Sequence, residues 1–304
     1  MYDQPVNLDH MELLLHAMHS KDMFNFAVGF ERFHRSGLTL GFKTALQAPY
    51  LMHQVLAFSA CHLARLIPER STRFHHQAMA LQTRAVSIFN ATRVEVDRSN
   101  CVPILLFSSM LGQHVLADTL AKRYQDGLDG FIKHYVQCVE MHRGIYTIAT
   151  SAWPLLMESE LEPILSLSQS FTSRDPKGDD CSLIIELVEQ ASEINPEEKQ
   201  ACRTAIRYLQ VGLDAAKTDD NPAISRYQMI CEWTMLVPPA FTQLLASKQP
   251  VALVVLAHYT LLLHSGKHLW QVGDAGQYIL EIVATYLGPQ WDAWLNYARD
   301  RVMQ

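Results

Sequence analysis

The sequence predicts an all-α fold of about a dozen helices that enclose a hydrophobic cavity. Apolar residues recur with helical spacing along most of the 304-residue chain, and prolines and capping residues stand at the starts of the segments. Strand-like alternation is nearly absent, and no period of about 30 to 45 residues repeats. Because 49% of residues are hydrophobic and only 18% are charged, we expect a large core, or a core plus a cavity, in one domain over residues 1–304.

The first predicted helix runs from Leu8 to Ser20. Its first turn carries Asp9 and Glu12, which the positive end of the helix dipole favours. Its apolar residues fall on one stripe, which gives the segment an amphipathic pattern. The stripe consists of Leu8, Met11, Leu15 and Met18.

Prolines and polar caps mark the next three helices. Pro49 opens a helix that continues through Leu66, where Pro68 closes it. A second helix is predicted from Ser71 to about Asn90. A third is predicted from about Cys101 to Ala117, with Asn100 as its cap.

Two further segments complete the middle of the chain. Residues 123–149 are predicted as a long helical stretch, in which glycines allow bending or close packing. Residues 166–182 are rich in Ser, Thr, Asp, Gly and Pro, and we expect a mobile loop there.

Prolines and capping residues also predict the helices of the C-terminal part. Asn195 and Pro196 provide a cap and a first-turn proline for a helix that ends near Lys217. Pro222 opens another helix, which Pro238 and Pro239 kink or split. The last three predicted helices run from Pro250 to near His268, from about Ala275 to Tyr286, and from Pro289 to Val302.

Composition excludes several classes of protein. The chain has 25 Lys and Arg against 31 Asp and Glu, a formal charge of −6, so we expect no direct contact with nucleic acid from this chain. Its six cysteines form no CxxC, which excludes a zinc ribbon or finger. No signal peptide is recognisable, so reduced thiols and a nuclear or cytoplasmic location are expected. The most apolar run, residues 251–263, is too short for a membrane span.

Several catalytic and cofactor motifs are missing from the sequence. GxGxxG, GxxxxGK[ST], HExxH and GxSxG are all absent, so no cofactor is expected. The pairs Asp179–Asp180 and Asp219–Asp220 lack the later carboxylate of a magnesium cluster. His264 and His268 share a helix face, but no carboxylate or cysteine accompanies them, and no metal is expected.

Two interpretations stay open for His258 and for the methionines of the helical segments. His258 lies among valines and leucines, where it is either a core histidine bonded to the backbone or a polar anchor inside an apolar ligand cavity. The methionines of the helical segments fit either a core or a lipid-accommodating pocket.

Four segments together resemble one family. PYLMHQVLAFSACHLARLIP, NCVPILLFSSMLGQHVLA, HRGIYTIATSAWPLLMESELEPIL and VALVVLAHYTLLLHSGKHLW are similar, in the same order, to the C-terminal effector domain of fungal zinc-cluster transcription factors of the sterol-uptake-control type. The resemblance covers nearly the whole chain. It implies an all-helical homodimer whose deep hydrophobic cavity receives a sterol or another apolar metabolite.

The chain departs from that family at two places. The family's six-cysteine, two-zinc DNA-binding cluster does not occur in this sequence. After Trp270, where the family has a glycine followed by a bulky aromatic residue, Gly273 is followed by Asp274. If this loop closes the cavity, the acidic residue puts a sterol-like occupant in doubt.

The resemblance implies a set of ligand-binding residues, for each of which ordinary core packing is the alternative. Phe107, Met110 and Leu111 are expected to form an apolar wall. His258, Tyr259 and Leu262 are expected to form a wall with polar tips, and Trp270 and Gly273 to lie at the closing loop.

Three functions follow from these observations. The leading one is a ligand-sensing regulatory module. The second is a stand-alone enzyme of fungal specialised metabolism, a cyclase or isomerase with acid–base catalysis in the apolar pocket. Whether the chain is an enzyme stays open, and its candidate catalytic residues are His258, His264 and His268. The third is a protein that sequesters full-length relatives in mixed dimers.

Overall fold

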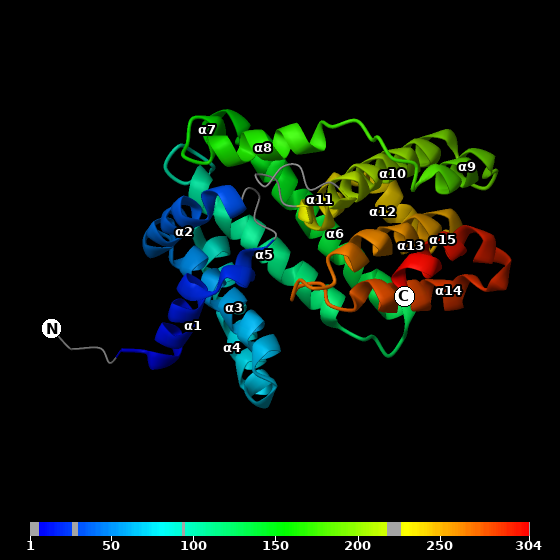
Figure 1. The fold of residues 1–304 in the computed structure, drawn as a ribbon. Coiled ribbons are helices and arrows are strands. Elements are labelled where there is room, and N and C mark those ends of the chain that lie inside the picture. The colour runs from blue at the N-terminus through cyan, green and yellow to red at the C-terminus, as the bar shows by residue number, and fades with distance from the viewer. Residues whose placement is uncertain (1–5, 26–29, 93–94, 218–225, 304) are drawn as a thin grey trace. The chain divides into compact units, whose positions relative to one another are not determined.

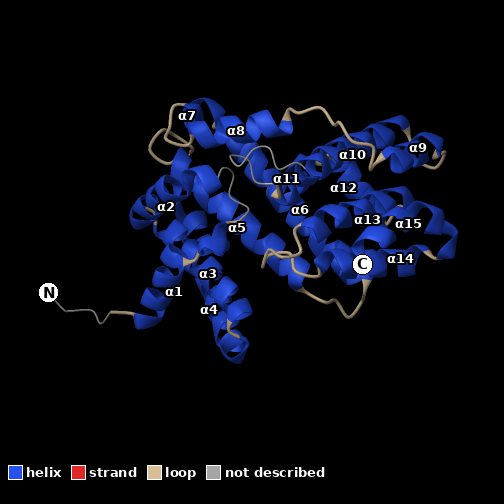
Figure 2. Cartoon of the chain, viewed as in Figure 1, coloured by secondary structure: helices blue, strands red, loops and turns tan. Residues whose placement is uncertain are grey.

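The computed structural model describes residues 6–25, 30–92, 95–217 and 226–303. Within these residues the chain contains fifteen α-helices and no strand, and about 80% of it is helical (Figure 2). The all-α prediction is confirmed. The chain divides into two compact units, which are described separately. Unit 1 comprises Met1–Asn25, Phe33–His114 and Ile148–Glu162, and unit 2 comprises Phe26–Arg32, Val115–Thr147 and Pro163–Gln304. The single domain expected from the sequence stays a prediction.

Unit 1 is built around two long helices that pack side by side, α3 and α4 (Figure 1). The start of α3 at Pro49 and its end at Leu66 are as predicted, because the proline ring suits a first helical turn. The helices of this unit are α1 (Leu8–His19), α2 (Phe30–Gln47), α3 (Pro49–Leu66), α4 (Ser71–Thr92), the first part of α5 (Cys101–Ala121), and α7 (Trp153–Met157).

Helix α1 presents its predicted apolar stripe to solvent. Its buried residues are instead Leu13 and Ala17, on the opposite side of the helix. Ion pairs from α1 fix this orientation, since Arg70 binds Glu12 at 2.7 Å and Arg73 binds Asp9 at 2.5 Å. The exposed stripe residues are Leu8, Met11, Leu15 and Met18, with exposed fractions of 76%, 40%, 57% and 50%.

Unit 2 surrounds the apolar helix α13. All residues from Val251 to Leu263 are buried, and α13 contacts α9, α10, α11, α12, α14 and α15. Gln249 caps its start, where Gln249 Oε1 accepts a hydrogen bond from Val251 N at 2.6 Å. The helices are α6 (Leu128–Ser151), α8 (Glu162–Thr172), α9 (Ser182–Gln190), α10 (Pro196–Lys217), α11 (Gln228–Leu236), α12 (Pro239–Ala246), α13 (Pro250–Ser265), α14 (Ala275–Leu287) and α15 (Asp292–Val302).

Several predicted boundaries differ from the observed ones, among them the end of α5, which lies at Ala121 instead of Ala117. The stretch predicted from residue 123 becomes α6 only at Leu128, because Gly127 has a φ of 58°, outside the helical region. The predicted loop 166–182 is helical up to Thr172, and only the residues between α8 and α9 are non-helical. Helix α13 ends at Ser265, before His268. The predicted split at Pro238 and Pro239 is confirmed, and Pro222 lies outside the described residues.

All six cysteines are buried and none forms a disulfide. Burial raises the pKa of Cys138 and Cys202 to about 12. These thiols therefore stay protonated near neutral pH.

Among the described residues, one helix is long and apolar enough to cross a membrane. It is α5, and half of its most apolar window is buried within the protein. Helices α12 and α13 pass the same test only if they are taken together, and they meet at an angle of 103°. Core helices of soluble proteins have the same length and composition, so this is weak evidence for a span.

The close approach of α10 to its neighbours gives a test of the packing in unit 2. A Cβ atom at Gly212 would lie 2.7 Å from Cβ of Met229 and 3.1 Å from Leu262. We expect Gly212→Ala to lower the free energy of unfolding by about 1–3 kcal/mol, despite the better helix propensity of alanine. The measurement is urea unfolding followed by circular dichroism.

The matched control is Gly144→Ala on α6, where nothing lies within 4 Å of the added atom. This variant should be as stable as the parent or more stable by up to about 1 kcal/mol. Equal effects of the two substitutions would contradict the tight packing of α10 on α11 and α13.

Candidate functional site

His258 lies in the buried core of unit 2, and one nitrogen of its imidazole ring is unused. His258 has no exposed surface, and its Nδ1 lies 3.0 Å from the carbonyl oxygen of Val254, one turn earlier on α13. A carbonyl only accepts, so Nδ1 carries the hydrogen. Nε2 is then a bare acceptor, and it has no hydrogen-bond partner. Burial lowers the pKa of His258 to about 4, although its bond to Val254 opposes that shift, so the ring is neutral near pH 7.

The ring of Tyr297, on α15, stacks over His258. The two rings are within 5° of parallel, with centroids 6.1 Å apart. The lone pair of Nε2 lies in the plane of the imidazole, so a ring stacked on its face does not satisfy it. The guanidinium of Arg301 also lies over the ring of Tyr297, 3.7 Å from its centroid.

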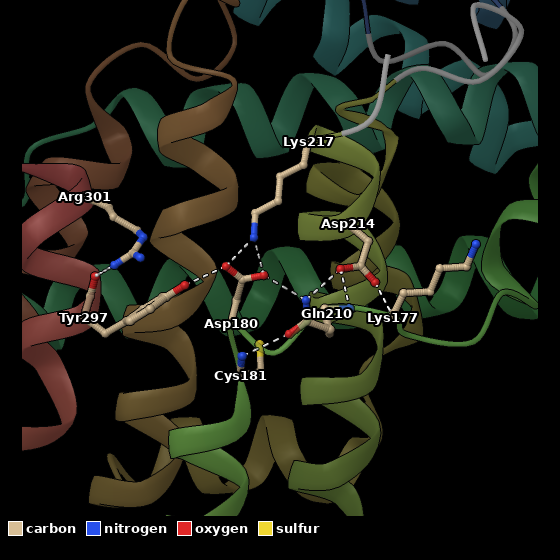
Figure 3. Close-up of polar contacts among 9 residues, drawn as sticks. Lys177, Asp180, Cys181, Gln210, Asp214, Lys217, Tyr297 and Arg301 are labelled. Atoms are coloured by element: carbon tan, nitrogen blue, oxygen red, sulfur yellow. Dashed lines mark hydrogen bonds and ion pairs between the residues drawn. The ribbon is translucent and has the colours of Figure 1, made fainter. Parts of the chain in front are cut away.

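The hydroxyl of Tyr297 is anchored by a nearly buried carboxylate, Asp180 (Figure 3). Asp180 Oδ1 accepts hydrogen bonds from Tyr297 at 2.6 Å and from Lys217 Nζ at 2.6 Å. Oδ2 accepts from Lys217 at 2.7 Å and from Gln210 Nε2 at 3.0 Å. Burial would raise the pKa of Asp180, but the hydrogen bonds from Lys217, Tyr297 and Gln210 outweigh it and hold the pKa at about 2.

The same network fastens the segment between α8 and α9 to α10. Asp214 accepts hydrogen bonds from the backbone amides of Lys177 at 2.7 Å and Gly178 at 3.0 Å. Gln210 Oε1 accepts from the amide of Cys181 at 2.9 Å. The part of the predicted mobile loop that is not helical is therefore tied down at several points (Figure 3).

Tyr259, predicted as a polar tip, uses its hydroxyl in a hydrogen bond to the backbone. It donates to the carbonyl oxygen of Ile230 at 2.6 Å. Its ring stacks on Trp233, with centroids 4.4 Å apart and planes within 14° of parallel. Trp233 in turn donates to the carbonyl of Ala205 at 2.8 Å. Tyr259 and the fully buried Leu262 thus have the contacts of core residues.

The other predicted site residues are divided between the two units. Phe107 is buried in unit 1 against the rings of Tyr50 and Phe89, while Met110 and Leu111 beside it on α5 are half-buried. In unit 2, Trp270 and Gly273 lie between α13 and α14, and both are half-buried.

The acidic residue of that connection has an electrostatic partner. Asp274 forms an ion pair with Arg123, whose guanidinium also lies 4.4 Å from the ring centroid of Tyr278. Asp274 therefore ties the start of α14 to the segment before α6, and Gly273 supports the turn with a φ of 53°.

His264 and His268 share no ligand geometry with His258. His264 is half-buried, with its Nε2 3.3 Å from Lys267 Nζ. Burial and then the charge of Lys267 lower the pKa of His264. His268 is exposed and packs edge-on against Tyr227, with centroids 4.9 Å apart. A cation next to His264 disfavours a metal at this place.

A surface cavity of about 440 Å³ lies elsewhere in unit 2, between α14 and α15. It is open to solvent, and the ion pair between Arg299 and Asp292, 2.5 Å long, lies in its wall. The predicted ligand-binding residues do not line this cavity. Apolar residues such as Leu280 and Met303 share this wall with the ion pair.

Sequence reasoning missed two buried carboxyl groups, Asp180 and Glu232. Asp180 was assigned to a loop, and its partners Lys217 and Tyr297 are 37 and 117 residues away. Glu232 has a local signal, since Gln228 precedes it by four residues in an otherwise apolar segment.

Comparison with known proteins gives no functional assignment, so the function must be argued from the residues described above. No protein-family model matches the chain, and no curated protein is significantly similar to it in sequence.

The anchoring role of Asp180 is testable by substitution. We expect Asp180→Asn to lower the free energy of unfolding at pH 7 by about 1–3 kcal/mol, because it weakens several charge-assisted hydrogen bonds. The effect should be near the lower end of that range, since Lys217 is 59% exposed and its charge is screened. Denaturant unfolding measures it.

Acid titration of the same variant gives a second readout. The folded pKa of Asp180 is depressed, so its contribution is present above the unfolded value near 3.8 and is lost as the pH falls toward 2. Asp180→Asn should lack this part of the acid sensitivity. The neighbouring Asp179 is exposed, and Asp179→Asn should behave like the parent chain. Identical results for the two variants would contradict the anchoring role.

Proposed function

We propose that unit 2 binds an apolar small molecule that carries a hydroxyl group, as the sensing part of a regulator similar to the fungal zinc-cluster effector domains. The observation that carries the proposal is Nε2 of His258, an acceptor without a donor inside an apolar core. The resemblance of the four sequence segments supports the regulatory role. The homodimer and the nuclear or cytoplasmic location belong to the same proposal and rest on that resemblance.

The chemistry of His258 selects the kind of ligand. A buried acceptor without a partner costs about 1–3 kcal/mol, which a ligand donor recovers on binding. Since the ring is neutral and Nδ1 is already used, Nε2 accepts from an O–H group. A ketone has no hydrogen to offer, and a carboxylate would bring an unpaired charge into the core. An apolar alcohol satisfies both requirements.

The burial of α13 supports sensing over storage. A ligand reaches His258 only when the helices around α13 separate, because no part of this side chain is exposed. The ligand therefore binds the arrangement of unit 2 in which these helices have separated better than the one in which His258 is enclosed. That difference in affinity is what shifts a population of conformations and so transmits a signal.

The same environment weighs against acid–base catalysis by α13. A general base works best when its pKa is close to the working pH, whereas burial lowers the pKa of His258 to about 4. His264 lies near the end of α13 and His268 lies beyond it, whereas His258 is enclosed within unit 2. We therefore rank the enzyme as the second candidate function, because a binding module explains the environment of His258 better.

The experiment compares an apolar alcohol with its methyl ether, which has nearly the same shape but no hydroxyl hydrogen. A sterol and its 3-methyl ether are a suitable first pair. We expect the sterol to raise the Tm of the purified chain, since a ligand at 100 times its Kd stabilises the folded state by about 2.7 kcal/mol. The ether should raise it much less.

His258→Phe removes the acceptor and should abolish the difference between alcohol and ether. The control is His53→Phe on α3, where Nδ1 makes the same bond to the carbonyl four residues earlier, at 2.8 Å. This control should retain the difference. If neither compound shifts the Tm of the parent chain over a panel of apolar alcohols, the proposed function is wrong.

A further inference from the structure

A buried acid lies in unit 2 apart from His258. Glu232, on α11, is 9% exposed, and its Oε1 accepts hydrogen bonds from Ser168 Oγ of α8 at 2.6 Å and from Gln228 Nε2 at 2.5 Å. Its second oxygen, Oε2, is buried and has no partner. Gln228 is 1% exposed, and its Oε1 is also buried without a partner.

These two unpartnered atoms are both acceptors, and they belong to side chains that the hydrogen bond from Gln228 Nε2 to Glu232 Oε1 already joins. An ionised Glu232 would leave a negative charge in the core beside a second lone pair, which is a costly arrangement. A proton on Oε2 would turn that oxygen into a donor, with Gln228 Oε1 as its acceptor. The acid and the amide would then exchange two hydrogen bonds, one in each direction.

No described cation offers an alternative explanation. The groups that set the ionisation of Glu232 are its burial, Ser168 and Gln228, with no charged side chain among them. The titratable groups that meet α11 from its neighbours include His142 and Cys138 of α6, which interact with Thr234 and Cys231, and Tyr259 of α13, which donates to Ile230. Cys231, the residue before Glu232 on α11, has a thiol whose pKa is raised by burial, so it stays neutral.

We propose that Glu232 is protonated near neutral pH and shares its proton with Gln228, and that this acid–amide pair with Ser168 is a proton-sensitive latch between α8 and α11. The proton comes from solvent and returns to it. Loss of the proton leaves a buried carboxylate facing an amide oxygen, which loosens the contact. The latch is independent of the ligand proposed for His258.

The direction of the pH dependence follows from the sign of the shift. Burial raises the pKa of Glu232 to about 7, against weaker opposing effects of Ser168 and Gln228. A group whose folded pKa lies above its unfolded value, here 4.5, stabilises the fold fully below pH 4.5. That contribution is lost as the pH rises through about 7.

The test is denaturant unfolding of the whole chain between pH 5 and pH 8. We expect Glu232 to raise the unfolding equilibrium constant of the parent chain roughly 50- to 100-fold over this range. Glu232→Gln keeps the shape and a donor but has no proton to lose, so its unfolding constant should lack that increase. The difference between the two chains isolates Glu232 from the other titrating groups.

The control is an exposed copy of the same arrangement. On α14, Gln277 Nε2 donates to Glu281 Oε1 at 3.0 Å with the same spacing of four residues, and Glu281 is exposed. Glu281→Gln should leave the pH dependence of the parent chain unchanged. If it removes as much pH dependence as Glu232→Gln, the proposal is overturned.

Infrared spectroscopy of the parent chain tests the proposal even if Glu232→Gln does not fold. A carbonyl band of a protonated carboxylic acid should be present at pH 6 and should disappear as the pH rises to 9. Its absence at pH 6 would show that Glu232 is ionised and would overturn the latch. Restoration of stability at pH 8 by potassium or ammonium ions would assign the two oxygens to a cation, and would also overturn it.

Discussion

The burial of α13 is the constraint on which unit 2 depends. Thirteen consecutive residues, Val251 to Leu263, have no face toward solvent, so apolar surface must cover the helix on every side. Burying one large aliphatic side chain contributes about 1.5–3 kcal/mol, and α13 carries three valines, five leucines and a tyrosine in this run. The surrounding helices supply that cover, and each of their polar residues near α13 must find a partner within the protein or remain unsatisfied.

The polar side chains around α13 meet this requirement in different ways. Tyr259 and Trp233 use backbone carbonyls as acceptors, and Asp180 accepts from three side chains. His258 and Glu232 each leave one atom without a partner. Fully satisfied groups stabilise one arrangement, whereas a partly satisfied group such as His258 or Glu232 is a place where a ligand or a proton changes the balance.

Local rules account for most of the helix boundaries. Pro49, Pro196 and Pro250 each stand at the first position of a helix, as their fixed φ requires. The pattern of α1 was less informative, because periodicity identifies an apolar stripe but not its direction. Leu8 and its companions face solvent since Arg70 and Arg73 hold the helix by its acidic residues.

The candidate site was only partly accessible to sequence reasoning. The alternative roles of His258 followed from its apolar neighbours, but its unused nitrogen is visible only with Val254 placed beside Nδ1. In the sequence, Asp179 and Asp180 are only an adjacent pair that lacks the later carboxylate of a magnesium cluster. The partners of Asp180 come from α10 and from the middle of α15, and such distant pairings leave no spacing rule in a single sequence.

The buried cysteines give each unit its own chemical probe of local opening. Cys61 and Cys101 lie in unit 1, and the other four lie in unit 2. A thiol enclosed in a folded unit reacts with an alkylating reagent only when that unit opens. Pulses of reagent followed by peptide mass spectrometry would therefore time the opening of each unit separately, without any engineered label, and would reveal whether the halves of this chain melt together or one after the other.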